Sequence, residues 1–272
     1  MSQPENLLQG RWALILGASS GFGAAISRAL AHEGMNIFGV HLDPRSTLDR
    51  AQAVVADIEA SGARAFFFNT NAADSRRRTR VLAKISDVLA DDAQMTIHLL
   101  VHTLAFGSLR PYFANEVENE TSEEQMEMTL RVMAHSLVYW TQDLVRDKLL
   151  GSGSRIYSMS SIGSQRATAS YGAVSAAKAA LEAHTRQLAL ELAPLGITAN
   201  CLMPGVTDTP ALRMIPGHEK IIEQVLASHP ARRLTTPGDV AQVIVALADP
   251  RVKWVSGAVI PVDGGEGAIS IG

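Results

Sequence analysis

Short, almost continuously apolar runs alternate along this chain with longer segments in which apolar residues recur at helical spacing. The short runs are typical of strands that are covered on both faces of a parallel sheet. We expect strands at 12–16, 36–42, 65–69, 97–101, 155–159, 198–203 and 258–262. We expect helices near 22–33, 47–60, 75–90, 122–148, 171–193 and 237–248. The alternation predicts βαβ units, and therefore an α/β fold with one doubly wound parallel sheet in a single domain over residues 1–272.

The segment 207–230 interrupts this alternation directly after the sixth expected strand. It contains Pro210, Pro216, Gly217 and Pro230. Ligands bind at the carboxyl edge of such a sheet, and long loops in compact domains are usually functional. We therefore interpret the segment as a flap over a substrate, with an ordinary pair of surface helices as the alternative.

Composition narrows the function classes. The chain has 272 residues and a formal net charge of −3, which gives no electrostatic reason to expect nucleic acid or a membrane surface as a partner. No apolar run approaches the ~18 residues of a membrane span, and the start MSQPENLLQGRW lacks the pattern of a signal peptide. The single cysteine, Cys201, excludes a disulfide within the chain, and no side chains have metal-ligand spacing. We expect a cytoplasmic protein without a metal.

A glycine-rich stretch, LILGASSGFGAAISRAL, begins in the first expected strand and continues into a helix. A glycine can form the tight turn there, and glycines leave room where the backbone meets a pyrophosphate and where the helix packs on the strand. The helix N-terminus points amide groups at phosphate, and serine hydroxyls can add donors. The pattern predicts a dinucleotide-binding loop made of Gly17, Ser19, Ser20, Gly21, Phe22 and Gly23.

Further motifs follow in order along the chain: LVHTLA at 100–105, a serine pair at 160–161, MPGVTDT at 203–209 and VDGG at 262–265. With the glycine spacing G-x-x-x-G-x-G, they make the sequence resemble the short-chain dehydrogenase/reductase family over nearly its whole length. The resemblance implies a Rossmann-type sheet of about seven strands and an NAD(P)H-dependent oxidoreductase. It places these residues beside the cofactor: Asn71, Ala72, Leu104, Ala105, Lys178, Pro204, Gly205, Val206, Thr207 and Thr209.

The segment VHLDPRS, after the second expected strand, bears on which nicotinamide cofactor binds. In such folds an acid at this point binds the adenosine ribose, whereas an arginine accommodates a 2′-phosphate. Asp43 and Arg45 stand two residues apart, and the sequence leaves open which of them faces the ribose. The pair Arg45–Ser46 resembles phosphate-binding relatives, which favours NADPH over NADH.

In the stretch SYGAVSAAK, Tyr171 precedes Lys178 by seven residues. Most relatives carry the tyrosine four residues before the lysine, and Val174 fills that position here. A lysine can bind the nicotinamide ribose and stabilise negative charge, and a phenol can protonate an oxyanion. When hydride goes to the β-carbon of an unsaturated thioester, negative charge appears on an oxygen two carbons away. A displaced tyrosine suits that reaction better than it suits ketone reduction.

The Tyr-x6-Lys spacing resembles that of the enoyl-acyl-carrier-protein reductases, and the runs at 101–107, 160–192 and 204–216 are similar to the type III enzymes. By this resemblance Tyr171 and Lys178 form the catalytic pair and Ser160 is the active-site serine. The resemblance also implies an acyl-thioester substrate, with acyl carrier protein as one candidate carrier, and a homotetramer. Three positions depart from it: Ser161 stands where many enoyl reductases have another tyrosine, Met133 where ordinary members have asparagine, and Ser20 where phosphate-binding relatives often have a basic residue.

We therefore expect an NAD(P)H-dependent reductase of enoyl thioesters. A 3-ketoacyl or carbonyl reductase, or an alcohol dehydrogenase, is the alternative. A non-catalytic cofactor-binding protein is a further one, which Met133 and Val174 keep open.

Overall fold

A single parallel sheet organises the protein, whose structure is a computed structural model describing residues 6–92 and 96–268. Residues 1–5, at the start of the segment MSQPENLLQGRW, and residues 269–272, at the other end of the expected domain, lie outside the described residues. The strands of the sheet are β1 (Trp12–Leu16), β2 (Asn36–His41), β3 (Ala65–Asn69), β4 (Ile97–His102), β5 (Arg155–Met159), β6 (Thr198–Pro204) and β7 (Val259–Val262). They run in the order β3-β2-β1-β4-β5-β6-β7, and every neighbouring pair is parallel. The predicted doubly wound, seven-stranded sheet is confirmed.

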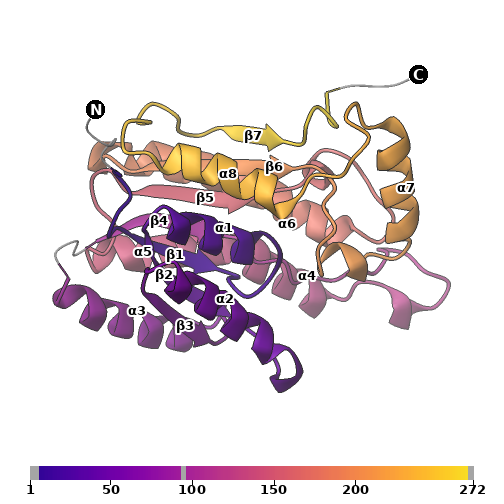
Figure 1. Ribbon diagram of the computed structural model, residues 1–272. Coiled ribbons are helices and arrows are strands. Elements are labelled where there is room, and N and C mark those ends of the chain that lie inside the picture. Colours follow the sequence, from indigo (N-terminus) through magenta and orange to yellow (C-terminus); the bar gives the residue numbers. More distant parts are fainter. Residues whose placement is uncertain (1–5, 93–95, 269–272) are drawn as a thin grey trace.

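Helices cover both faces of the sheet (Figure 1). One face carries α1 (Gly21–His32), α2 (Leu48–Ala60) and α8 (Pro237–Ala248), and the other carries α3 (Ser75–Ala90), α5 (Ser136–Arg146) and α6 (Gly172–Leu192). The strand order reverses between β1 and β4, because β2 and β3 lie on one side of β1 and all later strands on the other. A crevice for a ligand is expected outside the carboxyl ends of these two strands.

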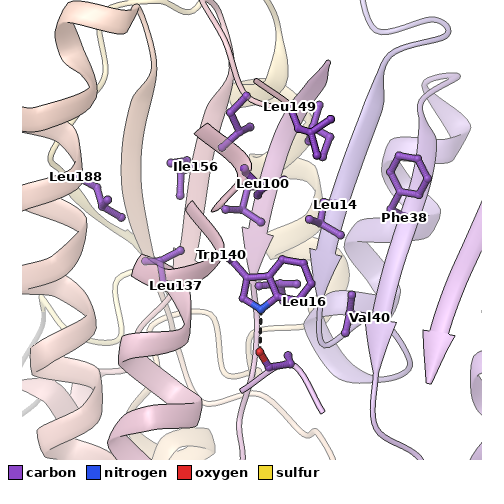
Figure 2. Close-up of a cluster of buried hydrophobic side chains, with 14 of the residues drawn as sticks. Leu14, Leu16, Phe38, Val40, Leu100, Leu137, Trp140, Leu149, Ile156 and Leu188 are labelled. Carbon is purple, nitrogen blue, oxygen red and sulfur yellow. Dashed lines mark hydrogen bonds between the residues drawn. The ribbon is translucent and has the colours of Figure 1, made fainter. Parts of the chain in front are cut away.

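Alternate residues of β1 belong to two separate hydrophobic cores. Trp12, Leu14 and Leu16 pack beneath α3, α5 and α6, whereas Ala13 and Ile15 pack beneath α1, α2 and α8. This is the period of two that a strand covered on both faces requires. Figure 2 shows the first core and the indole of Trp140, which donates a 2.9 Å hydrogen bond to the carbonyl oxygen of Ala72. That bond joins α5 to the loop after β3, and so fixes one wall of the crevice.

The helix expected at 122–148 is divided into α4 (Glu123–Leu130), a π-helical turn at Arg131–His135 and α5. It begins with a capping box between Ser122 and Gln125. Apolar periodicity did not reveal the π-helical turn, since the change is confined to one turn within a long amphipathic pattern. Such turns occur frequently at functional sites, and Met133 is buried inside this one.

The segment 207–230 holds a short 3₁₀ turn at Leu212–Met214 and α7 (His218–Ser228). No residue of α7 is fully buried. The ends of the segment are held: Thr207 pairs with Thr235 in a β-bridge, and the Nε2 atom of His229 lies 2.9 Å from the carbonyl oxygen of Asp263. That the segment covers a substrate stays a prediction. In residues 6–92 and 96–268 no helix is long and apolar enough to cross a membrane.

Candidate active site

The glycine loop after β1 is shaped by contacts that exclude side chains. Gly17 has φ of +98°, and a methyl group on it would lie 2.6 Å from Oγ1 of Thr103. A methyl group on Gly23 would lie 2.0 Å from the carbonyl oxygen of Gly17. Thr103 itself donates a 2.8 Å hydrogen bond to the carbonyl oxygen of Leu16, which joins the ends of β1 and β4. The loop therefore brings bare backbone to the crevice, as the approach of a pyrophosphate requires.

The N-terminus of α1 is suited to an anion. Ser20 is the N-cap residue, but its side chain makes no capping hydrogen bond, and the first turn contains no acidic residue. The first amide groups of a helix lack partners within it and carry the positive end of its dipole. Thr209, from the segment after β6, approaches this point, with its methyl carbon 3.6 Å from where a side chain on Gly21 would begin. These residues fit the phosphates of a dinucleotide.

Asp43, rather than Arg45, faces the glycine loop. Its carboxylate lies 2.8 Å from Nδ1 of His41, accepts a 2.9 Å hydrogen bond from Thr47 and is hydrogen-bonded to Ser19 in the loop. Partial burial would raise the pKa of Asp43, but the hydrogen bonds from Ser19, His41 and Thr47 hold it below the usual value. Arg45 begins a 3₁₀ turn and is exposed. Of the two residues that the sequence offered at VHLDPRS, Asp43 is therefore the one beside the glycine loop.

The loops after β3 and β4 form a second wall of the crevice. Asn69 joins this wall to the β2 end, because its side chain accepts a 3.0 Å hydrogen bond from the Asp43 amide. The side chain of Asn71 accepts a 2.9 Å bond from the Ala73 amide, and Ala72 is buried. Leu104 and Ala105 follow Thr103 directly, and Ala105 is exposed.

The segment after β6 closes the crevice from the far side. Pro204 ends the strand, and the hydroxyl of Thr207 donates a 2.9 Å hydrogen bond back to the carbonyl oxygen of Gly205. The amide of Val206 donates a 2.9 Å hydrogen bond to the carboxylate of Glu266. Burial raises the pKa of Glu266. Glu266 was missed in the sequence because it follows the VDGG motif and belongs to no pattern.

Tyr171 and Lys178 lie in different surroundings at the start of α6. Tyr171 is the N-cap residue, its ring packs on Gly163, and its hydroxyl is hydrogen-bonded to Ser161. Burial raises the pKa of Tyr171, and the bond with Ser161 partly opposes this. Lys178 is 5% exposed and donates a 2.6 Å hydrogen bond to the carbonyl oxygen of Met159. Burial lowers the pKa of Lys178 to about 8.

The two serines after β5 point to different partners. The Ser160 hydroxyl donates to the carboxylate of Glu182 on α6, and both residues are buried. The Ser161 hydroxyl contacts the Tyr171 phenol and accepts a 3.2 Å bond from the Gly163 amide. The sequence singled out Ser160, but the structure brings Ser161 to the phenol. The available signal was position 161 itself, where relatives carry a further tyrosine.

The position at which most relatives have tyrosine lies in an apolar cluster. A methyl group on Gly107 would lie 3.0 Å from the sulfur of Met133 and 3.1 Å from Cγ2 of Val174. Met133 and Val174 are both buried. These two side chains, which replace the usual asparagine and tyrosine, therefore pack about the same glycine and offer no proton donor.

One end of the crevice fits a dinucleotide, and the other offers a buried phenol and a buried ammonium group. This combination suits an NAD(P)-dependent oxidoreductase, in which the lysine binds the nicotinamide ribose and the phenol acts on an oxyanion. Residues 17–266 match the model of a family described as enoyl-(acyl carrier protein) reductase, and the chain belongs to this family of short-chain dehydrogenases/reductases.

Named relatives carry out more than one reaction. The chain is 29% identical to an NADPH-dependent aldehyde reductase-like protein of Arabidopsis thaliana, over 97% of both chains. It is 28% identical to 1-cyclohexenylcarbonyl-CoA reductase of Streptomyces collinus, over 93% of this chain and 85% of that one. A short-chain dehydrogenase of Burkholderia cenocepacia in complex with NADP is 30% identical, with a TM-score of 0.80 over 96% of this chain and all of that one. These names favour an enzyme over a non-catalytic protein.

The fold also matches that of enoyl-[acyl-carrier-protein] reductase (NADH) of Aquifex aeolicus, with a TM-score of 0.84 over 97% of this chain and 100% of that one. The identity is 21%, so this likeness concerns the fold.

Proposed function

We propose that the protein reduces the carbon–carbon double bond of enoyl thioesters with a nicotinamide cofactor. The observation that carries the proposal is the position of the Tyr171 phenol at the N-cap of α6, seven residues before Lys178. The alternative position, one turn before the lysine, is filled by buried Val174. A proton donor is thus set back along the helix, where an enolate oxygen of the substrate would lie.

Each residue of the pair has a separate task in this reaction. The bound cofactor supplies hydride to the β-carbon. Lys178 binds the ribose hydroxyls, and its ammonium group stabilises negative charge nearby. The Tyr171 hydroxyl donates a hydrogen bond to the thioester oxygen, where negative charge develops.

Carbonyl reduction is the second candidate. It is favoured by relatives such as the aldehyde reductase-like protein and by cyclohexanol dehydrogenase of Rhodococcus, which is 29% identical over 95% of this chain. Against it stands the absence of a proton donor at positions 133 and 174. A phenol displaced by most of a helical turn is poorly placed for an oxygen on the carbon that receives hydride.

The two candidates are separated by matched substrates. Oxidation of NADH and of NADPH would be followed with crotonyl and acetoacetyl thioesters, each on coenzyme A and on acyl carrier protein. We expect turnover of the crotonyl thioester to exceed that of the acetoacetyl thioester. Turnover of the acetoacetyl compound alone would reject enoyl reduction and favour the carbonyl reductase.

We propose NADH as the preferred cofactor. The sequence favoured NADPH because of Arg45 and Ser46, but the carboxylate of Asp43 is the group bonded to the glycine loop. A 2′-phosphate beside this carboxylate would be repelled, whereas ribose hydroxyls could donate to it. Ser20 also stands where phosphate-binding relatives often carry a basic residue. The Burkholderia relative in complex with NADP supports the opposite preference, so the cofactors need direct comparison.

The acyl chain is proposed to lie under the 207–230 segment, with the thioester carried by acyl carrier protein or coenzyme A. We propose a homotetramer formed through α5 and α6, a proposal that the exposed side chains of Tyr139 and Leu190 on these helices support. A cytoplasmic location is proposed from the single cysteine, whose thiol is buried.

A further inference from the structure

Glu182 is a buried acidic residue to which the proposed reaction gives no role. It is 8% exposed and follows Lys178 by four residues on α6. Residues four apart lie on the same face of a helix, so the carboxylate and the ammonium group both point toward the sheet. A buried carboxylate costs free energy unless it is hydrogen-bonded and balanced by a positive charge.

Glu182 and Lys178 hold two consecutive residues at the end of β5. The Lys178 ammonium group donates to the carbonyl oxygen of Met159, at 2.6 Å. The Glu182 carboxylate accepts from the hydroxyl of Ser160, the next residue. The residue after that is Ser161, which contacts the Tyr171 phenol. The orientation of the Ser161 and Tyr171 hydroxyl groups therefore depends on a chain of contacts that begins at Glu182.

Besides Glu182, two titratable groups in the described part of the chain interact electrostatically with Lys178, Cys201 on β6 and His102 on β4, and neither is charged near neutral pH. Burial raises the pKa of Cys201, on β6, to about 11, so its thiol is uncharged. Burial, with the nearby charge of Lys178, lowers the pKa of His102, on β4, to about 3, so its imidazole is neutral. Burial raises the pKa of Tyr171, so its phenol is neutral as well. Electrostatic interactions with Cys201 and with Glu182, four residues along the same buried helix face, oppose the effect of burial on Lys178 and raise its pKa.

We infer that Glu182 is a positioning residue, which fixes Ser160 beneath the active site and keeps Lys178 protonated in the pH range of turnover. The inference rests on the proposed role of Lys178, but it does not depend on whether the substrate is an enoyl or a carbonyl compound. It also gives Ser160 a task that differs from contact with the reacting atoms.

The test is the pH dependence of kcat/KM in Glu182→Gln. Glutamine keeps an oxygen that accepts from Ser160 but loses the negative charge. The alkaline limb of the profile, where kcat/KM falls as Lys178 loses its proton, should therefore move to a pH lower by about one unit. Well below the limb, activity should remain within about threefold of the wild type. Glu182→Asp retains the charge and should restore the limb to within about 0.3 pH units. Ser160→Ala keeps the carboxylate and should leave the limb unmoved.

Glu191→Gln is the matched control, because it makes the same change on the same helix at an exposed position. If the glutamine variant does not fold, Glu182→Met offers a charge-free side chain of similar volume, and burial of such a side chain is often tolerated. An unmoved limb in a folded, charge-free variant, or an equal shift in Glu191→Gln, would overturn the inference.

Cofactor affinity gives a second readout that needs no substrate. Quenching of protein fluorescence by NADH, measured across pH, reports the protonation of Lys178 through its bond to the ribose. The affinity of Glu182→Gln should fall at a lower pH than that of the wild type. If neither thioester is reduced but this shift is present, the proposed reaction fails and the role of Glu182 stands.

Discussion

The hydroxyl group of Tyr171 is hydrogen-bonded to the side chain of Ser161, in the loop after β5. Ser161 also accepts from the amide of Gly163, and Gly163 packs against the Tyr171 ring. The phenol and the serine are therefore fixed relative to one another before any substrate arrives. A donor whose direction is fixed in advance stabilises charge without reorganisation during the reaction.

Tyr171→Phe should lower kcat for the preferred substrate by about 100-fold or more, because it removes the proton donor and leaves the ring in place. Cofactor binding should remain. The matched control is Tyr139→Phe on α5, which makes the same change in an exposed side chain beside His135 and Arg78 and should leave the rate unchanged. Steady-state kinetics of both variants check this, and a Tyr171→Phe rate within twofold of the wild type would remove the phenol from the mechanism.

Ser161→Ala should lower kcat by about tenfold. The bond from Ser161 lowers the pKa of Tyr171, so its loss should raise that pKa and make the phenol a weaker acid. Ser164→Ala is the control in the same loop, because in the described structure the buried Ser164 hydroxyl has no hydrogen-bond partner. Its rate should match the wild type. Equal losses in both variants would show that the loop, and not the bond, matters.

Gly23→Ala should destabilise the protein by about 1–3 kcal/mol or more and should abolish cofactor binding, since the new methyl group would overlap the Gly17 carbonyl oxygen. Thermal unfolding and NADH titration measure the two effects. Gly151→Ala has no heavy atom within 4 Å of the added carbon, apart from its chain neighbours, and should change stability by less than about 0.5 kcal/mol. Normal NADH affinity in Gly23→Ala would contradict the proposal that the bare backbone of the glycine loop binds the pyrophosphate.

Asp43→Asn should raise the kcat/KM ratio of NADPH to NADH by about tenfold or more, because it removes a negative charge from the expected place of the 2′-phosphate. Asp49→Asn, at the exposed first turn of α2, makes the same change in charge and should leave the ratio unchanged. A wild-type preference for NADPH that Asp43→Asn does not alter would show that Arg45 decides the cofactor.

Activity should fall as the pH rises through about 8. Burial places the pKa of Lys178 at about 8, so its ammonium group is present below this pH and is lost above it. The fall should appear in the pH profile of kcat/KM, which reports the free enzyme. Lys178→Arg, whose side chain remains charged, should show no such limb, although its activity should be low because the guanidinium group does not fit the site. A flat wild-type profile between pH 7 and 10 would contradict this assignment.

The sheet and the glycine loop were predictable because they depend on local patterns. Buried parallel strands are mostly apolar, and the Gly17–Gly23 spacing follows from backbone contacts within a few residues. Strand ends were misplaced by one residue at most: β2 ends at His41, and β4 continues to His102. Such ends depend on pairing with neighbours that the sequence does not specify.

The side-chain directions at the site were not predictable, since they depend on contacts between distant segments. Adjacent serines at 160 and 161 are equivalent in the sequence, but one meets Glu182 on α6 and the other meets Tyr171. The position of Asp43 beside the glycine loop likewise depends on Ser19, which lies more than 20 residues away in the chain. The role of Glu266 depends on the pairing of β7 with β6, which brings the end of the chain to Val206.

The bond between Glu266 and Val206 also orders events during synthesis. The first four strands, β1 to β4, can pair as soon as they leave the ribosome, because they are neighbours at one side of the sheet. At that stage the crevice has the glycine loop and the loops after β3 and β4, but not the segment after β6. Its far side forms when β7 pairs with β6 and Glu266 reaches the Val206 amide, after β1 to β6 have been synthesised. A nascent chain stalled before residue 259 would therefore hold the glycine loop already folded but no complete binding site.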